Sequence, residues 1–199
     1  MKRTITRLYD SRTDALEAAH ELERMGIDDD DISIIASNKD NWYDSKSGVT
    51  GKHDRDADGR DDRAEGAVKG AATGGIIGAG AGLLAGLGVL AIPGLGPVVA
   101  AGWLTSTLTG AAVGAVGGGA VGGLVTALVE AGVPEEDAHV YSEGVRRGGT
   151  LLTVRVDDDR ASQVASALER YRPTDVRVRG QEYRSSGWTR FDPNAPPPI

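Results

Sequence analysis

Apolar and polar residues alternate at the start of the chain, a pattern typical of a β-strand with one buried face. The alternation covers residues 4–9, and Asp10 and Ser11 then offer N-caps for a helix. The apolar residues that follow recur at helical spacing: Ala15, Leu16, Ala19, Leu22 and Met25. Gly26 is well placed as the C-terminal cap, and Ile32 to Ala36 read as a second strand. Residues 1–37 are therefore predicted to form one βαβ half.

A similar order of patterns returns over residues 133–180. A helix is predicted over Glu135 to Arg147, and a strand over Leu151 to Val156. An amphipathic helix ends before Pro173, and Val176 with Val178 begins a final strand. Two βαβ halves predict an α+β fold: a ferredoxin-like split βαβ sandwich with a four-stranded antiparallel sheet and both helices on one face. Its central connection is opened to receive an insertion.

The insertion begins with a polar, acidic stretch, residues 38–66, which is predicted to be a flexible linker. From Gly70 to Val129 no side chain is ionisable. Small residues recur there every four positions, in two runs separated by the prolines and glycines of residues 92–97: Gly70, Gly74, Gly78, Gly82 and Gly86, then Gly102, Ser106, Gly110, Gly114, Gly118 and Gly122. This period places small residues in a stripe along a helix, on which a second backbone can pack closely. Residues 67–132 are therefore predicted to form a glycine-zipper helical hairpin.

Two environments fit such a hairpin. A helix over Gly70 to Ala91 would be about 33 Å long, enough for a hydrocarbon core of about 30 Å. A transmembrane pair would keep both flanks on one side, and the arginines beside the hairpin place that side in the cytoplasm. The alternative is a soluble hairpin that hides its apolar faces in a homo-oligomer. The predicted location is thus the inner membrane with cytoplasmic flanks, or the cytoplasm if an oligomer buries the hairpin.

Composition narrows the classes of function. The formal net charge of −7 argues against nucleic acid as a partner, because binding a duplex requires a dense basic face. The absence of cysteine excludes disulfides, thiolate metal sites and cysteine nucleophiles. Neither a nucleophile-elbow motif nor a phosphate-binding loop occurs. No catalytic residue and no cofactor is predicted, and the chain is expected not to be an enzyme.

One motif in the linker has the spacing of a calcium loop. Asp54, Asp56, Asp58 and Glu65 match D-x-D-x-D-G-x5-E, in which alternate carboxylates converge on the cation and the last can bind through both oxygens. Asp61 occupies a position that is usually apolar, and several arginines dilute the acidic charge. The alternatives are a calcium site and a solvated acidic linker.

The opening pattern, with Tyr9, Asp10, Gly26 and Ile32 to Ile35, resembles bacterial general-stress proteins of the YflT type. The segment Tyr141 to Gly149 is similar to the second half of longer relatives that carry a central glycine zipper. The resemblance implies a stress-linked bacterial protein with no catalytic residues to carry over.

The sequence thus predicts a non-enzymatic stress protein that acts as a membrane-associated, self-assembling scaffold or interaction module. The alternative is a soluble module that responds to calcium or to another ligand and buries its hairpin in an oligomer. Residues 181–199 are predicted to be a disordered tail.

Overall fold

The computed structural model describes residues 2–43, 87–114 and 123–195 of the chain. These residues form a mixed α+β fold around a five-stranded sheet in the order β1-β5-β2-β4-β3, in which all neighbouring strands are antiparallel. The strands are β1 (Lys2–Tyr9), β2 (Ile32–Ser37), β3 (Gly88–Ile92), β4 (Gly96–Gly102) and β5 (Thr150–Asp157). The helices are α1 (Arg12–Arg24), α4 (Trp103–Gly114), α5 (Gly123–Glu130), α6 (Glu135–Arg146), α7 (Ala161–Glu169) and α8 (Val176–Ser185), with a 3-10 turn, η1, at Asp29–Asp31.

The first half follows its predicted local signals. The Ser11 hydroxyl accepts a hydrogen bond from the Asp14 N–H at 3.2 Å and so caps α1. Gly26 follows the helix with a φ of +74°, the left-handed conformation expected of a C-terminal glycine. The buried side of α1 consists of Ala15, Ala18, Ala19 and Leu22. The predictions of β1, α1 and β2 are therefore confirmed, as are those of α6 and β5.

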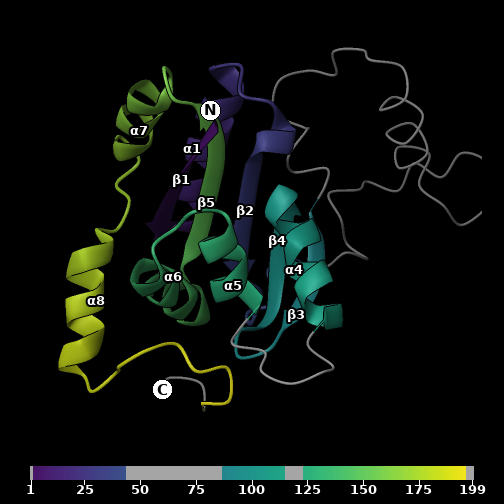
Figure 1. Cartoon of the computed structure of the whole chain (residues 1–199), viewed down its shortest axis with the longest axis vertical. Coiled ribbons are helices and arrows are strands. Elements are labelled where there is room, and N and C mark those ends of the chain that lie inside the picture. The colour runs from purple at the N-terminus through teal and green to yellow at the C-terminus, as the bar shows by residue number, and fades with distance from the viewer. Residues whose placement is uncertain (1, 44–86, 115–122, 196–199) are drawn as a thin grey trace, which may run out of the picture.

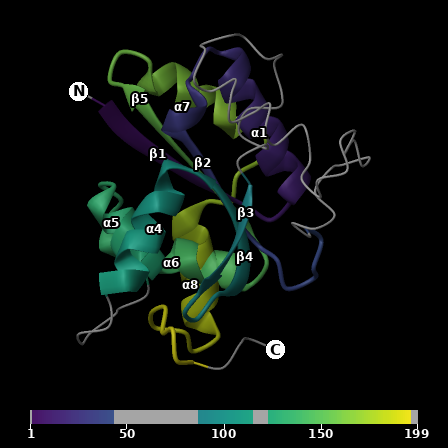
Figure 2. The ribbon, with the colours of Figure 1, turned by 90° about the vertical axis from the view of Figure 1, so that its right-hand side faces the viewer.

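Helices cover both faces of the sheet (Figures 1 and 2). On one face α1 and α7 pack over β1, β5 and β2, and their core includes Leu22, Ile32 and Leu168. On the other face α4, α5 and α6 pack over the sheet, and their core includes Leu104 and Leu128. The sheet is thus the middle layer of three, and its two edge strands are β1 and β3.

The glycine-zipper helical hairpin is wrong for residues 88–102. These residues form the β-hairpin β3-β4, and β4 pairs with β2. The predicted turn is correctly placed, because the Leu95 N–H donates to the Ile92 carbonyl at 3.0 Å within the hairpin loop. Four consecutive residues of β4, Val98 to Ala101, are at most 1% exposed. A continuous apolar run buried on both faces fits a central strand as well as a helix, and pairing with β2 favours the strand.

The predicted final strand at Val176 and Val178 is also wrong. Thr174 makes an isolated antiparallel bridge to Leu8, and the chain then turns into α8. The Asp175 carboxylate accepts hydrogen bonds from the N–H groups of Arg177 and Val178, at 2.8 and 3.1 Å. This N-cap stabilises the first helical turn, so that a strong local signal overrides the β propensity of the two valines.

The C-terminal segment differs from the prediction of a disordered tail as far as Ala195. Phe191 is 2% exposed and belongs to the core that lies under α4 and α6. The Trp188 ring lies edge-on to the Tyr183 ring, with centroids 5.6 Å apart. Pro193 lies against Gly94 in the β3-β4 turn. Burial of two aromatic rings compensates for the entropy lost when this segment is ordered.

Among residues 2–43, 87–114 and 123–195, no helix is both long enough and apolar enough to cross a bilayer. Of the first predicted membrane segment, only residues 87–91 are described, and residues 88–91 lie in β3. Gly70 to Gly86 lie outside the described residues.

Candidate functional site

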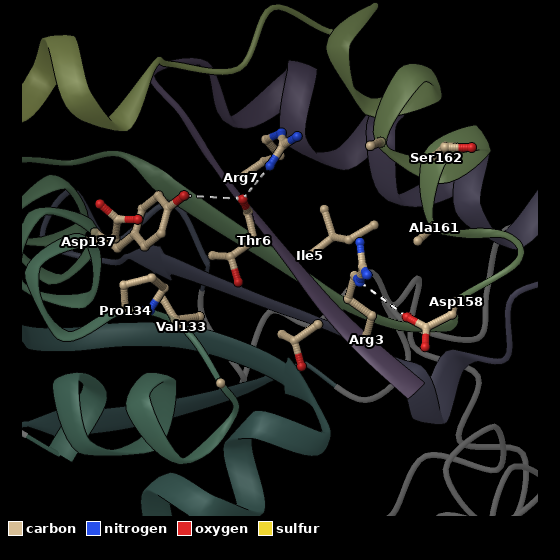
Figure 3. A pocket seen from close by; sticks show the side chains of 14 residues that line it. Arg3, Ile5, Thr6, Arg7, Val133, Pro134, Asp137, Asp158, Ala161 and Ser162 are labelled. Atoms are coloured by element: carbon tan, nitrogen blue, oxygen red, sulfur yellow. Dashed lines mark hydrogen bonds and ion pairs between the residues drawn. The ribbon is translucent and has the colours of Figure 1, made fainter. Parts of the chain in front are cut away.

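A cleft of about 380 Å³ runs along the free edge of β1 (Figure 3). Residues 3–7 of β1 form its floor. One wall is the loop from Gly132 to Pro134 together with α6, and the other is the start of α7. The cleft exists because helices from opposite faces of the sheet both extend past its edge strand.

The backbone of β1 offers unused hydrogen-bonding groups to this cleft. The Leu8 carbonyl accepts from the Thr174 N–H at 2.7 Å, so the even-numbered residues of β1 direct their N–H and C=O groups away from β5. The Thr6 carbonyl accepts from the Tyr141 hydroxyl at 3.2 Å. Within the described parts of the chain, no group bonds to the N–H of Thr4 or Thr6, or to the Thr4 carbonyl. The edge therefore offers two donors and one acceptor in a row.

Side chains of alternate residues line the two sides of the cleft. Arg3 and Arg7 lie towards α7, where Arg3 pairs with Asp158 at 3.2 Å and Arg7 pairs with Glu169 at 3.0 Å. Towards α6 the wall consists of Val133, Pro134, Asp137 and the Tyr141 ring. Both arginines thus have carboxylate partners, and the cleft also contains small and apolar side chains.

Two titratable groups in the wall of the cleft, Tyr141 and Asp137, have raised pKa values. Burial raises the pKa of Tyr141 to about 12, so that its hydroxyl stays protonated at neutral pH and donates to the Thr6 carbonyl. Burial, assisted by the neighbouring Glu136, also raises the pKa of Asp137 above its ordinary value, although Arg177 opposes this shift. The lining contains no histidine, lysine or cysteine. Its carboxylates are those of Asp137 and Asp158, and its hydroxyls are those of Thr4, Thr6, Tyr141 and Ser162.

The structure gives Gly102 a role different from the predicted one. Instead of lying in a helical packing seam, Gly102 ends β4 with a φ of +86°. A Cβ atom there would lie 1.9 Å from the Ile32 carbonyl oxygen, so the glycine lets β4 approach β2. Gly110 and Gly114 do lie in a helix, α4.

The remaining predicted site residues fall outside the described part of the chain. These are Gly70, Gly74, Gly78, Gly82, Gly86, Gly118 and Gly122 of the zipper, and Asp54, Asp56, Asp58 and Glu65 of the calcium-like loop. Elsewhere, in the residues that the structure does describe, no three His, Cys, Asp or Glu side chains are grouped so that they could hold a metal ion. Calcium binding stays a prediction.

The sequence analysis missed the cleft because it predicted a final strand of the sheet at Val176 and Val178, where the structure has α8. The signal that could have revealed it is Asp175, an N-cap residue directly before the segment Val176 to Val178. A helix beginning there cannot also extend along β1.

Comparison with known proteins gave no match to a family model, a curated protein or a solved structure. The resemblance to general-stress proteins therefore stays a prediction.

Proposed function

We propose that the protein is a non-enzymatic scaffold whose α+β domain binds an extended segment of a partner protein along the free edge of β1. The observation that carries this proposal is the row of unpaired backbone groups at Thr4 and Thr6, which lies at the floor of a cleft. Addition of a strand to an exposed sheet edge is a recurring mode of peptide recognition: main-chain hydrogen bonds supply affinity, and pockets for alternate side chains supply specificity.

The shape and chemistry of the cleft favour a single strand. The walls at Val133 to Pro134 and at Ala161 stand on either side of β1, so an extended chain bound along this edge would lie between them. Side chains of a bound strand would alternate between these walls. Small or apolar side chains fit both, since Ala161 and Ala165 line one side and Val133 and Pro134 the other.

Replacing Thr4 with proline is expected to weaken peptide binding at least about tenfold with little loss of stability. Proline removes the outward N–H of Thr4 and places its ring in the path of an added strand, while the hydrogen bonds between β1 and β5 stay intact. Peptides of ten residues, selected on the full chain from a random display library, serve as probes. Their dissociation constants are measured by fluorescence anisotropy.

The matched control for this test is Thr4→Val, which keeps the backbone donor and favours the strand. It should bind the selected peptides as the unaltered protein does. Equal affinities of the proline and valine variants would contradict the proposal, and so would failure of the library to yield binders.

We further propose that the glycine stripe from Gly70 to Gly86 assembles copies of the protein, at the cytoplasmic side of the inner membrane or within a cytoplasmic oligomer. Burial within the domain accounts for much of the uncharged run after Leu87, because β4 and α5 contribute buried residues to the core. The Tyr43 hydroxyl donates to the Leu87 carbonyl at 3.1 Å, so the two residues that flank segment 44–86 are held together. What supports assembly is thus the four-residue glycine period between them.

Replacing Gly78 with leucine is expected to reduce the size of the assembly, because the side chain separates backbones packed on the stripe. Gly78→Ala is the control, since a small residue keeps close approach. Light scattering in detergent gives the size, and a carbonate wash of the membrane fraction followed by detergent extraction gives the location. An assembly of unchanged size and location in the leucine variant would contradict this part of the proposal.

A further inference from the structure

The two edges of the sheet carry opposite kinds of residue. The β1 edge bears Lys2, Arg3 and Arg7, and charged residues of this kind discourage pairing between sheets. The hairpin from Gly88 to Gly102, which forms the other edge, contains no charged residue. On its outer strand, β3, Val89 is 41% exposed. In the described part of the chain, this edge strand thus carries none of the charged side chains by which proteins often prevent edge-to-edge association.

The hydrogen-bond pattern of the hairpin shows which groups of β3 face outward. The Pro97 carbonyl accepts from the Asn38 N–H at 2.8 Å, so Pro97 directs its carbonyl away from β3, and its partner in register, Ala91, is not hydrogen-bonded to it. The N–H and C=O groups of Ala91, and of Val89 two residues earlier, therefore point away from β4. Among the residues described, none bonds to these four groups. Leu87 has the same orientation, and Tyr43 occupies its carbonyl.

We propose that β3 pairs antiparallel with β3 of a second copy, centred on Leu90. In this register the outward groups of Val89 face those of Ala91 in the other copy, which gives four backbone hydrogen bonds across the two-fold axis. A large side chain then faces a small one, Val89 opposite Ala91, and Ile92 lies opposite Gly88. No like charges meet, because the strand carries none.

Neighbouring registers are less favourable. A shift by one pair in one direction would require the Leu87 carbonyl, which already accepts from the Tyr43 hydroxyl at 3.1 Å. The opposite shift places Val89 against Pro93, which has no N–H to donate. Only the register centred on Leu90 leaves the paired groups free on both copies. This contact goes beyond the proposed function, because it needs neither the β1 cleft nor the glycine stripe.

Cysteine substitution tests both the contact and its register, since the natural chain has no cysteine. In the Leu90→Cys variant the two thiols meet across the axis at a non-hydrogen-bonded pair, where Cα atoms are about 4.5 Å apart and a disulfide fits. Mild oxidation of the full chain is expected to cross-link most of it into a dimer on non-reducing gels. Val89→Cys is the matched control: its thiols are diagonal neighbours about 7–8 Å apart, and it should cross-link several-fold less.

Two further variants separate this contact from other effects. Adding Ala91→Lys, which places a charge on the exposed strand, should abolish the Leu90→Cys cross-link while the monomer stays folded. Adding Gly78→Leu should leave the cross-link unchanged, which distinguishes the β3 contact from assembly by the glycine stripe. The proposal is overturned if Leu90→Cys gives no dimer, if both cysteine positions cross-link equally, or if Ala91→Lys leaves the cross-link intact.

Discussion

Replacing Gly102 with alanine is expected to destabilise the protein by more than about 4 kcal/mol, a loss that few single substitutions cause. Two costs combine. Gly102 has a φ of +86°, and an alanine held in such a conformation costs on the order of 1–3 kcal/mol. Its Cβ would also lie 1.9 Å from the Ile32 carbonyl oxygen and 2.7 Å from the Ser33 Cα. Both are backbone atoms of β2, so relief requires the β2-β4 pairing to open.

The control for this prediction is Gly132→Ala. Gly132 has a φ of +91°, but a Cβ there would meet no atom within 4 Å, so the substitution carries the conformational cost alone. Urea unfolding followed by tryptophan fluorescence gives the free energy of unfolding of the two variants. The comparison requires that this free energy depends equally steeply on urea concentration in both. If the Gly102→Ala variant is no less stable than the Gly132→Ala variant, the inference that β4 approaches β2 too closely for a side chain at Gly102 is wrong.

Gly102 also illustrates why the first half of the fold could be predicted and the insertion could not. The segment that forms β1 alternates polar with apolar residues, and α1 repeats apolar residues at helical spacing between Ser11 and Gly26. In both segments the period of the pattern can be recognised from the sequence, and for α1 the capping residues also mark its limits. From Gly70 to Val129 no charged residue marks a solvent face. Glycines four residues apart then suggest a stripe along a helix, although one of them, Gly102, ends the strand β4.

The prediction of a strand near the C-terminus was wrong for another reason. Val176 and Val178 have the composition of a strand, but the Asp175 side chain accepts hydrogen bonds from the N–H groups of Arg177 and Val178, and Gly180 packs near Val140 of α6. A contact between two helices far apart in the sequence cannot be read from local propensity. The β1 cleft could not be predicted for the same reason, because its floor and its two walls come from segments far apart in the sequence. The different character of the two sheet edges, in contrast, can be recognised in the sequence, because β1 carries charged residues and β3 carries none.

A buried ion pair within α6, whose arginine contacts the C-terminal segment, could not be predicted from the sequence either. Glu143 is fully buried, and its carboxylate lies 2.5 Å from the Arg146 guanidinium and 2.7 Å from Nε of Arg147. Arg146 is 5% exposed, donates to the Asp192 carbonyl at 3.1 Å and stacks over the Phe191 ring at 5.2 Å from its centroid. One carboxylate thus orients the arginine that holds the C-terminal segment against the core.

Replacing Glu143 with alanine is therefore expected to cost about 3–5 kcal/mol, because Arg146 would remain buried without a counter-charge. Glu136→Gln on the same helix is the control: Glu136 pairs with Arg184, and their side chains are 74% and 40% exposed, so its loss should cost less than about 1 kcal/mol. The double variant Glu143→Met with Arg146→Met should recover more than half of the loss, since apolar residues of similar size often replace a buried pair without cost.

Release of the C-terminal segment distinguishes this account from a general loss of packing. With Arg146 no longer oriented, Phe191 should leave the core before the sheet unfolds, and limited proteolysis in the native state should cut between Gly187 and Asp192 faster in Glu143→Ala than in Glu136→Gln. Proteolysis at equal rates in the two variants, or a double variant no more stable than the single one, would mean that the carboxylate does not hold this segment through Arg146. The ion pair would then have no role in holding the C-terminal segment, and an apolar pair would stabilise the core as well.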